Sequence, residues 1–194
     1  MRALPTRLQG PVLLEPRVFG DARGFFVETY RRSVLDDLGV HVDFVQHNHS
    51  RSSRGVLRGM HLQVGEGQAK LVRCARGAIL DVIVDVRHGS PHFGGWEAFR
   101  LDDELHHQLF VPVGFAHGFL VLSETADVTY LCSSYYAPDL ERTIAHDDPA
   151  IGIDWPAGPR LLSDRDRAAR PLAEVAPDLP FAFAPPGGRR PGEG

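Results

Sequence analysis

The chain of 194 residues carries a formal net charge of −4, and 43% of its residues are hydrophobic, as is usual for a water-soluble domain. It has no basic run that would bind a polyanion, so the sequence predicts no nucleic-acid partner. No apolar stretch approaches the roughly 18 residues that a membrane-spanning helix needs, and no signal-peptide pattern follows Met1. We therefore expect a cytoplasmic protein with no membrane partner.

Short apolar runs, separated by 20 glycines and 15 prolines, predict many short strands joined by turns. In chain order, strands are expected at residues 11–15, 24–30, 42–49, 56–63, 70–76, 79–86, 96–101, 108–113, 118–122 and 126–133. A helix is expected at residues 31–38, where Gly39 supplies the stop, and a short one after Ser163, a suitable N-cap. The Pro/Gly-rich residues 184–194 are expected to form a flexible tail behind a single domain at 1–183.

About ten short strands in one domain indicate two sheets packed face to face or a closed barrel, because only these arrangements bury so many half-apolar strands. An all-β jelly roll with a few short helices fits the length best. The mouth of such a fold can enclose a small ligand, so the polar residues expected near it are candidates for chemistry.

Ten histidines are many for this length, and several lie inside predicted strands. A metal site on a strand usually gathers imidazoles at alternate positions with a carboxylate nearby. His61 is followed two positions later by Gln63, a poor ligand, and the pair His47 and His49 has no acidic neighbour on its own face of the strand. The residues therefore favour a metal-free general base over a bound catalytic metal.

His61 is the best-placed candidate for this base, although a hydrogen-bonded interior histidine is the alternative explanation. It follows Arg58 by three positions, so on a regular strand the two side chains would point to opposite faces. Gly59 between them can host a β-bulge, which would turn both side chains inward.

Lys70 is the only lysine of the chain, which has arginine at its other 20 basic positions. It begins a predicted strand whose next residues on the same face, Val72 and Cys74, are apolar, so its ammonium is expected to project into the end of the barrel. A compact ammonium can stabilise a developing oxyanion, whereas a planar guanidinium suits carboxylates and phosphates. A solvated surface lysine remains the alternative.

Tyr130 and Asp166 are weaker candidates when the residues are considered alone. Tyr130 can donate a proton or simply pack in the core or at the rim. Asp166 can orient a histidine or complete the start of the short helix after Ser163. Sequence patterns of Ser nucleophiles, of P-loops and of dinucleotide-binding loops are absent, which disfavours acyl transfer and ATP chemistry.

The chain resembles the dTDP-4-dehydrorhamnose 3,5-epimerase family over about residues 5 to 170. The resemblance rests on motifs that occur in order: "GDARGFFVETY", "FVQHNHS", "RGVLRGMHLQ", "QAKLVRCARGAILDVIVDVR", "GSPHFG", "VPVGFAHGFLVLSETA", "YLCSSYYAP" and "DDPAIGIDWP" followed by "LLSDRD". It implies a cupin-type jelly roll that forms a homodimer, partly by exchange of N-terminal strands, and works with neither metal nor cofactor. The implied substrate is a dTDP-linked 4-keto-6-deoxy sugar.

The resemblance also implies roles for individual residues. His61 matches the general base, Tyr130 the proton donor, Asp166 the residue that orients the base, and Lys70 the lysine beside the reacting sugar. Tyr136 matches a residue that stacks on thymine. The positions that match substrate contacts are Arg23, Glu28, Gln46, Asn48, Arg58, His117, Tyr136, Glu141 and Arg165.

The implied chemistry agrees with what the residues can do. A ketone at C4 acidifies the hydrogens at C3 and C5, and the resulting enolate needs a base on one face, a proton donor on the other and a cation at its oxygen. His61, Tyr130 and Lys70 would fill these three roles. Arginines such as Arg23 and Arg58 would hold the diphosphate through charge-assisted hydrogen bonds.

Two positions depart from the family pattern: His47, where an acid is common, and His146, where an aromatic residue is frequent. We favour epimerisation at both C3 and C5, because the catalytic motifs depart little. The alternatives are a mono-epimerase for antibiotic deoxysugars and a sugar-nucleotide 3,4-ketoisomerase. A non-catalytic nucleotide-sugar-binding module and a metal-dependent cupin oxygenase are further alternatives.

Overall fold

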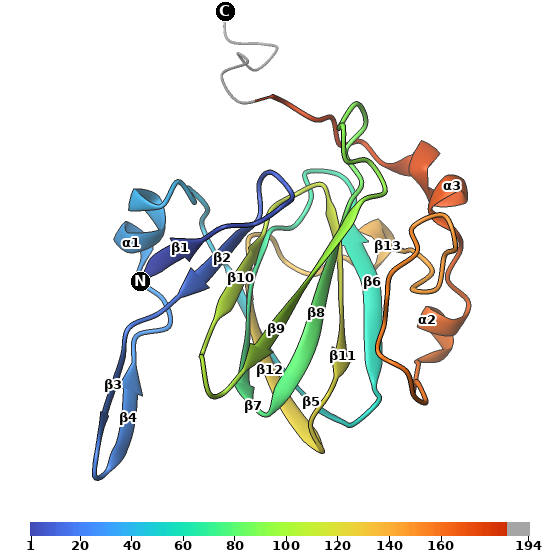
Figure 1. The fold of residues 1–194 in the computed structure, drawn as a ribbon. Coiled ribbons are helices and arrows are strands. Elements are labelled where there is room, and N and C mark those ends of the chain that lie inside the picture. The colour runs from blue at the N-terminus through green and yellow to red at the C-terminus, as the bar shows by residue number, and fades with distance from the viewer. Residues whose placement is uncertain (186–194) are drawn as a thin grey trace, which may run out of the picture.

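The computed structural model describes residues 1–185, and Figure 1 shows their arrangement. Residues 186–194, most of the predicted flexible tail 184–194, lie outside the described residues. Within residues 1–185, no helix is long and apolar enough to cross a membrane.

Two antiparallel sheets make up the body of the molecule, as the all-β prediction required. The six-stranded sheet has the order β1 (Arg2–Leu4), β2 (Val12–Glu15), β10 (Gln108–Val111), β7 (Lys70–Arg76), β12 (Thr125–Cys132) and β5 (Gln46–Ser53). The five-stranded sheet has the order β13 (Glu141–Thr143), β6 (Leu57–Gln63), β11 (Phe115–Val121), β8 (Ala78–Asp85) and β9 (Trp96–Asp102).

The space between the sheets holds an apolar core at one end. Alternate residues of the strands supply it, including Val72 and Cys74 of β7, Ile79 and Ile83 of β8, and Val128 of β12. Since side chains along a strand alternate between faces, the same strands place residues on the outer faces of both sheets as well. Other parts of the chain must therefore pack on the apolar residues of those outer faces.

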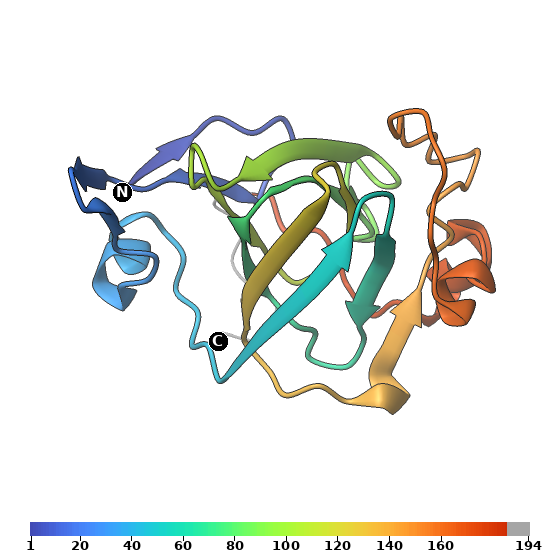
Figure 2. The same cartoon turned by 90° about the horizontal axis from the view of Figure 1, so that it is seen from below.

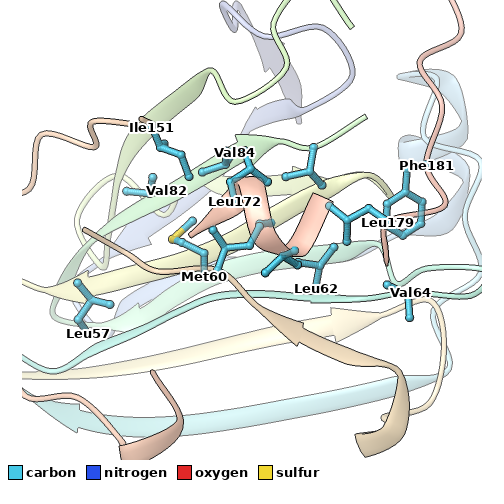
Figure 3. Close-up of a cluster of buried hydrophobic side chains, with 14 of the residues drawn as sticks. Leu57, Met60, Leu62, Val64, Val82, Val84, Ile151, Leu172, Leu179 and Phe181 are labelled. Carbon is cyan, nitrogen blue, oxygen red and sulfur yellow. The ribbon is translucent and has the colours of Figure 1, made fainter. Parts of the chain in front are cut away.

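The chain after β13 covers the outer face of the five-stranded sheet. Met60 and Leu62 of β6 and Val82 and Val84 of β8 pack there against residues of the C-terminal segment, among them Leu172 (Figure 3). The segment includes α2 (Asp164–Arg167), α3 (Leu172–Val175) and the 3₁₀ turn η2 (Ala176–Asp178). Another 3₁₀ turn, η1 (Pro138–Leu140), precedes β13.

Helix α1 (Arg32–Asp37) covers part of the outer face of the six-stranded sheet, on the opposite side of the molecule from α2 and α3 (Figure 2). Leu35 of α1 and Val40 pack with Leu14, Leu71 and Phe110 of the sheet. The remainder of this outer face is polar and half-exposed, and β5 is an edge strand among the residues that the structure describes.

A two-stranded hairpin, β3 (Val18–Asp21) and β4 (Gly24–Val27), projects away from both sheets (Figure 1). Its side chains are largely exposed, and Phe25 and Phe26 are 59% and 68% exposed. The ring of Phe25, close to the turn of the hairpin, lies 4.5 Å from that of His106, centroid to centroid. Exposed phenylalanines at this density are unusual for a surface that faces only water.

Several predicted boundaries were wrong. The strand expected at 42–49 runs from Gln46 to Ser53, because Val42 and Phe44 pack beside α1 instead of pairing with a strand. The strand expected at 24–30 ends at Val27. Strands β1, β3 and β13 were not predicted, and neither was α3. The helices expected at 31–38 and after Ser163 are present as α1 and α2.

Candidate active site

A polar cavity of about 540 Å³ occupies the end of the barrel opposite the apolar core. Its walls come from both sheets and from the chain on either side of β13. Of the residues expected at the site, it is lined by Gln46, Asn48, Arg58, His61, Lys70, His117, Tyr130, Tyr136, Glu141 and Arg165. The structure thus brings together residues that are up to 119 positions apart in the chain, from 46 to 165.

The β-bulge predicted at Gly59 is present and explains how Arg58 and His61 both reach the cavity. His117 of β11 is paired with His61 and Phe119 with Arg58, so three steps along β6 oppose two steps along β11. Gly59 has a φ of +130°, and a Cβ on it would lie 2.5 Å from the Cα of Gly118. Glycine is therefore required for the close approach of the two strands.

His61 forms a hydrogen-bonded pair with Asp166 across the cavity wall. The ring atom Nε2 lies 2.5 Å from Oδ1 of Asp166, whose side chain is 3% exposed. An ionised carboxylate only accepts, so Nε2 carries the hydrogen and Nδ1 keeps the lone pair. Burial raises the pKa of the Asp166 carboxyl, but the interactions with His61, Ser163 and Arg165 together outweigh burial, so that pKa lies below its ordinary value.

Asp166 is placed by the start of α2. The side chain of Ser163 accepts a hydrogen bond from the backbone N–H of Asp166 at 3.1 Å, which makes Ser163 the N-cap of the short helix. Asp166 therefore has both of the positions that the sequence suggested: it lies in the first turn of the helix and contacts the imidazole of His61.

A second imidazole and carboxylate pair lies on the adjacent strand. His117 is the strand partner of His61, and its Nε2 lies 3.0 and 2.9 Å from the two carboxylate oxygens of Asp81. Asp81 is fully buried, and the sequence prediction did not include it among the site residues. The carboxylate fixes the ring of His117 with Nε2 protonated, by the same argument as for His61.

Lys70 projects into the cavity as its position at the start of β7 predicted. No hydrogen bond or ion pair engages its ammonium within residues 1–185. Burial lowers the pKa of Lys70, and this effect outweighs the charges of Cys132, Glu141 and Asp81, which raise it. The cavity thus holds one ammonium that is available to a negatively charged atom of a ligand.

Tyr130 reaches the cavity from β12, in the same sheet as Lys70. Burial raises the pKa of its phenol, with a smaller opposing effect from Asn48 and Arg58. The hydroxyl is consequently held in its protonated form, which suits a proton donor. His61 belongs to β6 of the opposite sheet, so the imidazole and the phenol enter the cavity from different sheets.

The chain between β12 and β13 lies against the rim of the cavity and is held by three glutamine side chains. Gln46 accepts a hydrogen bond from the backbone N–H of Tyr136 at 2.9 Å, and Gln63 accepts one from that of Ala137 at 2.7 Å. Gln68 donates to the carbonyl of Ser134 at 2.8 Å. These amides fix the segment that carries Tyr136.

Tyr136, Glu141 and Arg165 form a linked group at the rim. The hydroxyl of Tyr136 donates to Oε2 of Glu141 at 2.7 Å, and Arg165 forms an ion pair with the same carboxylate. Tyr136 remains 51% exposed, so its ring offers a surface on which a planar group can stack.

Two predicted contact residues, Arg23 and Glu28, do not line the cavity. Arg23 is at the tip of the projecting hairpin, where it pairs with Asp21. Glu28 follows β4 and is bound to Arg31 at 3.0 Å from Nε to Oε2. Within a single copy of the chain, neither side chain is part of the candidate site.

Sequence reasoning missed several cavity residues, namely His47, His49, Ser50, Gln68 and Phe119. Alternation along β5 could have indicated Ser50, because it shares a face with Gln46 and Asn48. His49 does have an acidic neighbour, since its Nε2 lies 3.4 Å from Asp127 of β12, which the strand's own sequence could not show. Gln68 gave no signal, because it precedes its strand.

The site contains groups suited to proton transfer: two carboxylate-bound imidazoles, a protonated phenol and an ammonium. Within residues 1–185, no group of three or more His, Cys, Asp or Glu side chains is arranged to hold a metal ion. The two cysteines, Cys74 and Cys132, are free and buried. The arrangement can remove a proton from carbon, stabilise an oxyanion and return a proton from another direction.

Known proteins match this chain over almost its whole length. The family model described as dTDP-4-dehydrorhamnose 3,5-epimerase matches residues 5–174. The dTDP-4-dehydrorhamnose 3,5-epimerase of Pseudomonas aeruginosa is 48% identical over 177 residues, which cover 90% of this chain and 98% of that protein. The chain belongs to the dTDP-4-dehydrorhamnose 3,5-epimerase family.

Solved structures of this epimerase family share the fold. The dTDP-6-deoxy-D-glucose-3,5-epimerase of Legionella pneumophila, in complex with dTDP-4-keto-L-rhamnose, has a TM-score of 0.92 and 42% identity, and the match covers 95% of this chain and 99% of that one. The 3'-monoepimerase ChmJ of Streptomyces bikiniensis, in complex with dTDP-quinovose, has a TM-score of 0.82 and 42% identity, with 88% of each chain covered. The predicted cupin-type jelly roll and epimerase family are thereby confirmed.

Proposed function

We propose that this chain converts dTDP-4-dehydro-6-deoxy-D-glucose into dTDP-4-dehydro-L-rhamnose by inverting C3 and C5, with neither cofactor nor metal. The observation that carries the proposal is the convergence of His61, paired with Asp166, with Tyr130 and Lys70 around one cavity. Membership of the epimerase family supports the reaction class. The Legionella relative, solved with dTDP-4-keto-L-rhamnose, supports the substrate class.

The proposed reaction uses each group once per inverted carbon. The Nδ1 atom of His61 takes the proton from carbon, and the electron pair of the broken C–H bond moves into the carbonyl to form an enolate. The ammonium of Lys70 stabilises the negative charge on O4. Tyr130 then gives a proton to the same carbon from the opposite side, which inverts it, and both groups exchange protons with solvent afterwards.

Asp166 acts in this scheme as a positioning residue. Its carboxylate holds Nε2 of His61 protonated and stabilises the imidazolium that forms when Nδ1 accepts a proton. His117, held by Asp81, is placed beside His61 and is proposed to contact the sugar. We assign Arg58, Gln46, Asn48, Glu141 and Arg165 to contacts with the nucleotide or the sugar, and Tyr136 to stacking on thymine.

We further propose that the enzyme is a homodimer in which the hairpin of one copy reaches the cavity of the other. The support is that Arg23 and Glu28, which match substrate contacts, lie outside the cavity of their own chain, whereas the hairpin that carries Arg23 exposes Phe25 and Phe26. A partner's hairpin would bring Arg23 to the diphosphate and would bury the phenylalanines at the same time.

A cytoplasmic location is proposed on the state of the thiols. Both cysteines are buried and unpaired, as is usual in a reducing compartment, and Cys74 belongs to the apolar core between the sheets. The nucleotide-linked substrate would be found in the same compartment.

The deciding experiment is proton NMR of the product after incubation of the substrate in heavy water. Deuterium at both C3 and C5 is expected, because each carbon is deprotonated and reprotonated from groups that exchange with solvent. The variant His61→Asn should incorporate none at either carbon. His41→Asn is the matched control, because His41 is an exposed histidine that does not line the cavity, and it should behave as the unmodified enzyme.

The similarity to ChmJ favours a second candidate, a mono-epimerase that inverts a single carbon. Deuterium at only one of C3 and C5 would identify that activity. Movement of the carbonyl from C4 to C3 would identify a ketoisomerase, and an absence of exchange in the presence of tight binding would identify a binding module.

A further inference from the structure

Gln63 is a buried residue of β6 to which the proposed reaction assigns no role. Its neighbours Leu62 and Val64 pack in the core on the outer face of the five-stranded sheet (Figure 3). Since side chains alternate along a strand, Gln63 points to the inner face, as does His61 two positions earlier. Gln63 is 6% exposed and is not among the residues that line the cavity. Any effect of its side chain on a ligand must therefore pass through the residues that it binds.

The side-chain amide of Gln63 holds the segment between β12 and η1 by three contacts. Its Oε1 accepts a hydrogen bond from the backbone N–H of Ala137 at 2.7 Å. Its Nε2 donates to the carbonyl of Tyr135 at 3.3 Å and to the hydroxyl of Ser134 at 3.4 Å. The N–H of Ala137 requires an oxygen opposite it, which fixes the orientation of the amide. Both the donor and the acceptor of Gln63 are thus used on one short segment.

These contacts fix the backbone conformation of Tyr136. Peptide units are planar, so the conformation of a residue is set by the two planes that flank it. The plane before Tyr136 contains the carbonyl of Tyr135, bound by Gln63, and the N–H of Tyr136, which donates to Gln46 at 2.9 Å. The plane after it contains the N–H of Ala137, also bound by Gln63. Gln63 therefore contacts both planes and sets the direction in which the side chain of Tyr136 leaves the backbone.

The far end of the Tyr136 side chain is held from the same strand. Its hydroxyl donates to Oε2 of Glu141 at 2.7 Å, and Glu141 is the register partner of Gln63 in the pairing of β13 with β6. Strand β6 thus holds Tyr136 at two points: at the backbone through the Gln63 amide, and at the hydroxyl through Glu141. The ring between these points lines the cavity and is half-exposed.

A ring that is held in this way is ordered before a ligand arrives. A ligand that stacks on an ordered ring does not have to supply the free energy for fixing the segment that carries it. The same strand also carries His61, so a nucleobase stacked on Tyr136 would occupy a fixed place relative to the proposed general base. The position of the sugar between the two would be fixed as well.

We propose that Gln63 is a positioning residue for nucleotide binding, whose amide holds Tyr136 in the conformation that stacks on thymine. The inference deepens the proposed function and rests on its nucleotide-linked substrate. The competing explanation is that Gln63 only completes the attachment of the segment to β6. In that case its replacement would lower stability and would have no specific effect on the nucleotide.

The test uses Gln63→Met in the full chain, which removes the amide and keeps a side chain of similar length. The dissociation constant of dTDP, measured by titration calorimetry, should rise on the order of 10-fold, as for partial loss of the stacking of a base on an aromatic ring. Turnover at saturating substrate should change less than about threefold, because Gln63 does not line the cavity. Gln9→Met, at an exposed glutamine outside the cavity, is the matched control and should leave both quantities unchanged.

A double-mutant cycle with Tyr136→Ala separates positioning of the ring from general damage to the rim. Tyr136→Ala removes the ring and should weaken dTDP binding at least as much as Gln63→Met does. In the combined variant, Gln63→Met should cost no further affinity, because no ring remains to be placed. Additive losses would overturn the proposal, and so would a dTDP dissociation constant that Gln63→Met leaves unchanged.

Amide hydrogen exchange of the unmodified chain keeps the proposal testable if Gln63→Met fails to fold. The N–H of Ala137 precedes η1, outside any strand, yet it should exchange slowly because the buried Gln63 accepts its hydrogen bond. Addition of dTDP should slow this exchange only slightly. Fast exchange in the free protein that becomes slow with dTDP would mean that the nucleotide itself orders the segment, and this would overturn the proposal.

Failure of the proposed reaction would be recognised separately, since binding of dTDP needs no turnover. A chain that binds dTDP with the expected effect of Gln63→Met, but exchanges no carbon-bound hydrogen, would contradict the epimerase reaction and support the role of Gln63. A chain that does not bind dTDP would contradict both.

Discussion

The compact shape of the Lys70 ammonium explains why the proposed reaction requires a lysine and not an arginine at this position. The chain has arginine at 20 of its 21 Lys and Arg positions, yet its one lysine is among the three Lys and Arg residues that line the cavity, beside Arg58 and Arg165. A guanidinium is broad and planar, whereas an ammonium is a compact charge that can approach one oxygen atom closely. In the proposed reaction, that atom is O4 of the enolate.

Lys70→Arg is therefore expected to fold and to bind the nucleotide while losing most of its activity. Loss of one oxyanion-stabilising donor typically lowers turnover on the order of 10²- to 10³-fold, and we expect a decrease of that size. The measurement is the turnover number at saturating substrate, together with the affinity for dTDP and the unfolding temperature. Arg76→Lys, the reverse exchange at an exposed position, is the control, and a nearly unchanged rate in Lys70→Arg would remove Lys70 from the mechanism.

At the residue scale, the sequence indicated candidate site residues where the chemical type of a side chain and its spacing along one strand pointed to the same role. His61, Arg58 and Gly59 could be interpreted together because a bulge is a local feature of one strand. Asp81 could not be found in this way. Its role depends on the register between β8 and β11, which places its carboxylate at His117, 36 positions further along the chain. No local pattern contains that information.

At the scale of elements, the bulge between β6 and β11 depends on two facing glycines. A Cβ on Gly118 would lie 2.7 Å from Sδ of Met60 and 2.8 Å from the carbonyl oxygen of Arg58. Both distances are too short for an ordinary contact, and the carbonyl belongs to the backbone, so the strands would have to separate. His61 and Arg58 would move with β6.

Gly118→Ala is accordingly expected to lower the free energy of unfolding by about 1–3 kcal/mol, the usual cost of overpacking in a core, and to lower activity as well. Urea unfolding and the exchange assay measure the two effects. Gly20→Ala in β3 is the matched control, since the nearest atom to its Cβ would be 3.8 Å away. Equal stability of the two variants would show that the close approach of β6 and β11 carries no constraint.

A network of charges joins β5 to β12 on the outer face of the six-stranded sheet. Arg51 of β5 donates to both carboxylate oxygens of Asp127 at 2.7 and 2.8 Å, and His49 lies 3.4 Å from the same side chain. The hydrogen bond from Arg51 lowers the pKa of Asp127 to about 2. A lowered pKa in the folded state means that the charged carboxylate stabilises the fold above its unfolded pKa of about 3.9, and that this contribution is lost as the pH falls towards 2.

Asp127→Asn should therefore be less sensitive to acid than the unmodified chain. Between pH 4 and pH 2, the unmodified protein should take up about one proton more on unfolding than the variant does, so its stability should fall more steeply. Urea unfolding at a series of pH values measures the slope. Asp139→Asn, at an exposed aspartate whose carboxylate forms no ion pair within residues 1–185, should retain the slope of the unmodified chain. Identical slopes in all three proteins would contradict the argument.

Strands could be predicted where apolar and polar residues alternate over several positions, and they were missed where the alternation covers only a few positions. The long strands β7, β8 and β12 could be located from alternation and β-branched residues, whereas β1 and β13 have three residues each and β3 has four. The start of β5 was misplaced because Val42 and Phe44 alternate as strand residues do, yet pack beside α1. Alternation reports burial on one side of the chain and does not report pairing.

At the scale of the whole molecule, the hairpin β3–β4 supplies no residue to the three hydrophobic cores of the described part of its own copy. Its Arg23 lies outside the cavity of the same copy. In the proposed dimer, each active site would combine His61, Tyr130 and Lys70 of one copy with Arg23 of the other. Two defective chains should then be able to restore one complete site.

A mixture of Arg23→Ala and His61→Asn chains tests this arrangement. Each variant alone should have little activity, the first through weak substrate binding and the second through loss of the base. In an equal mixture, half of the dimers are mixed, and each has one complete site of two, so about a quarter of the unmodified activity should return. Unfolding and refolding the chains together ensures exchange of copies.

The outcome separates the two possible positions of Arg23. If its side chain served the cavity of its own copy, a mixed dimer would have no complete site, and the mixture would remain as inactive as its components. Arg17→Ala combined with His61→Asn provides the control, because Arg17 lies at the base of the hairpin over the ring of Phe19 and outside the cavity.

The unpaired ammonium of Lys70 also makes the interior of the cavity observable. Apart from the N-terminus, it is the only primary amine in the chain, so growth on lysine enriched with ¹⁵N at the ζ position would give a protein with a single labelled side-chain nitrogen. That nitrogen takes part in the proposed chemistry and belongs to a residue that lines the cavity together with Tyr130 and His117. One resonance would therefore report the charge state and the ligand contacts of the reaction chamber, with no signal from the rest of the molecule to be assigned.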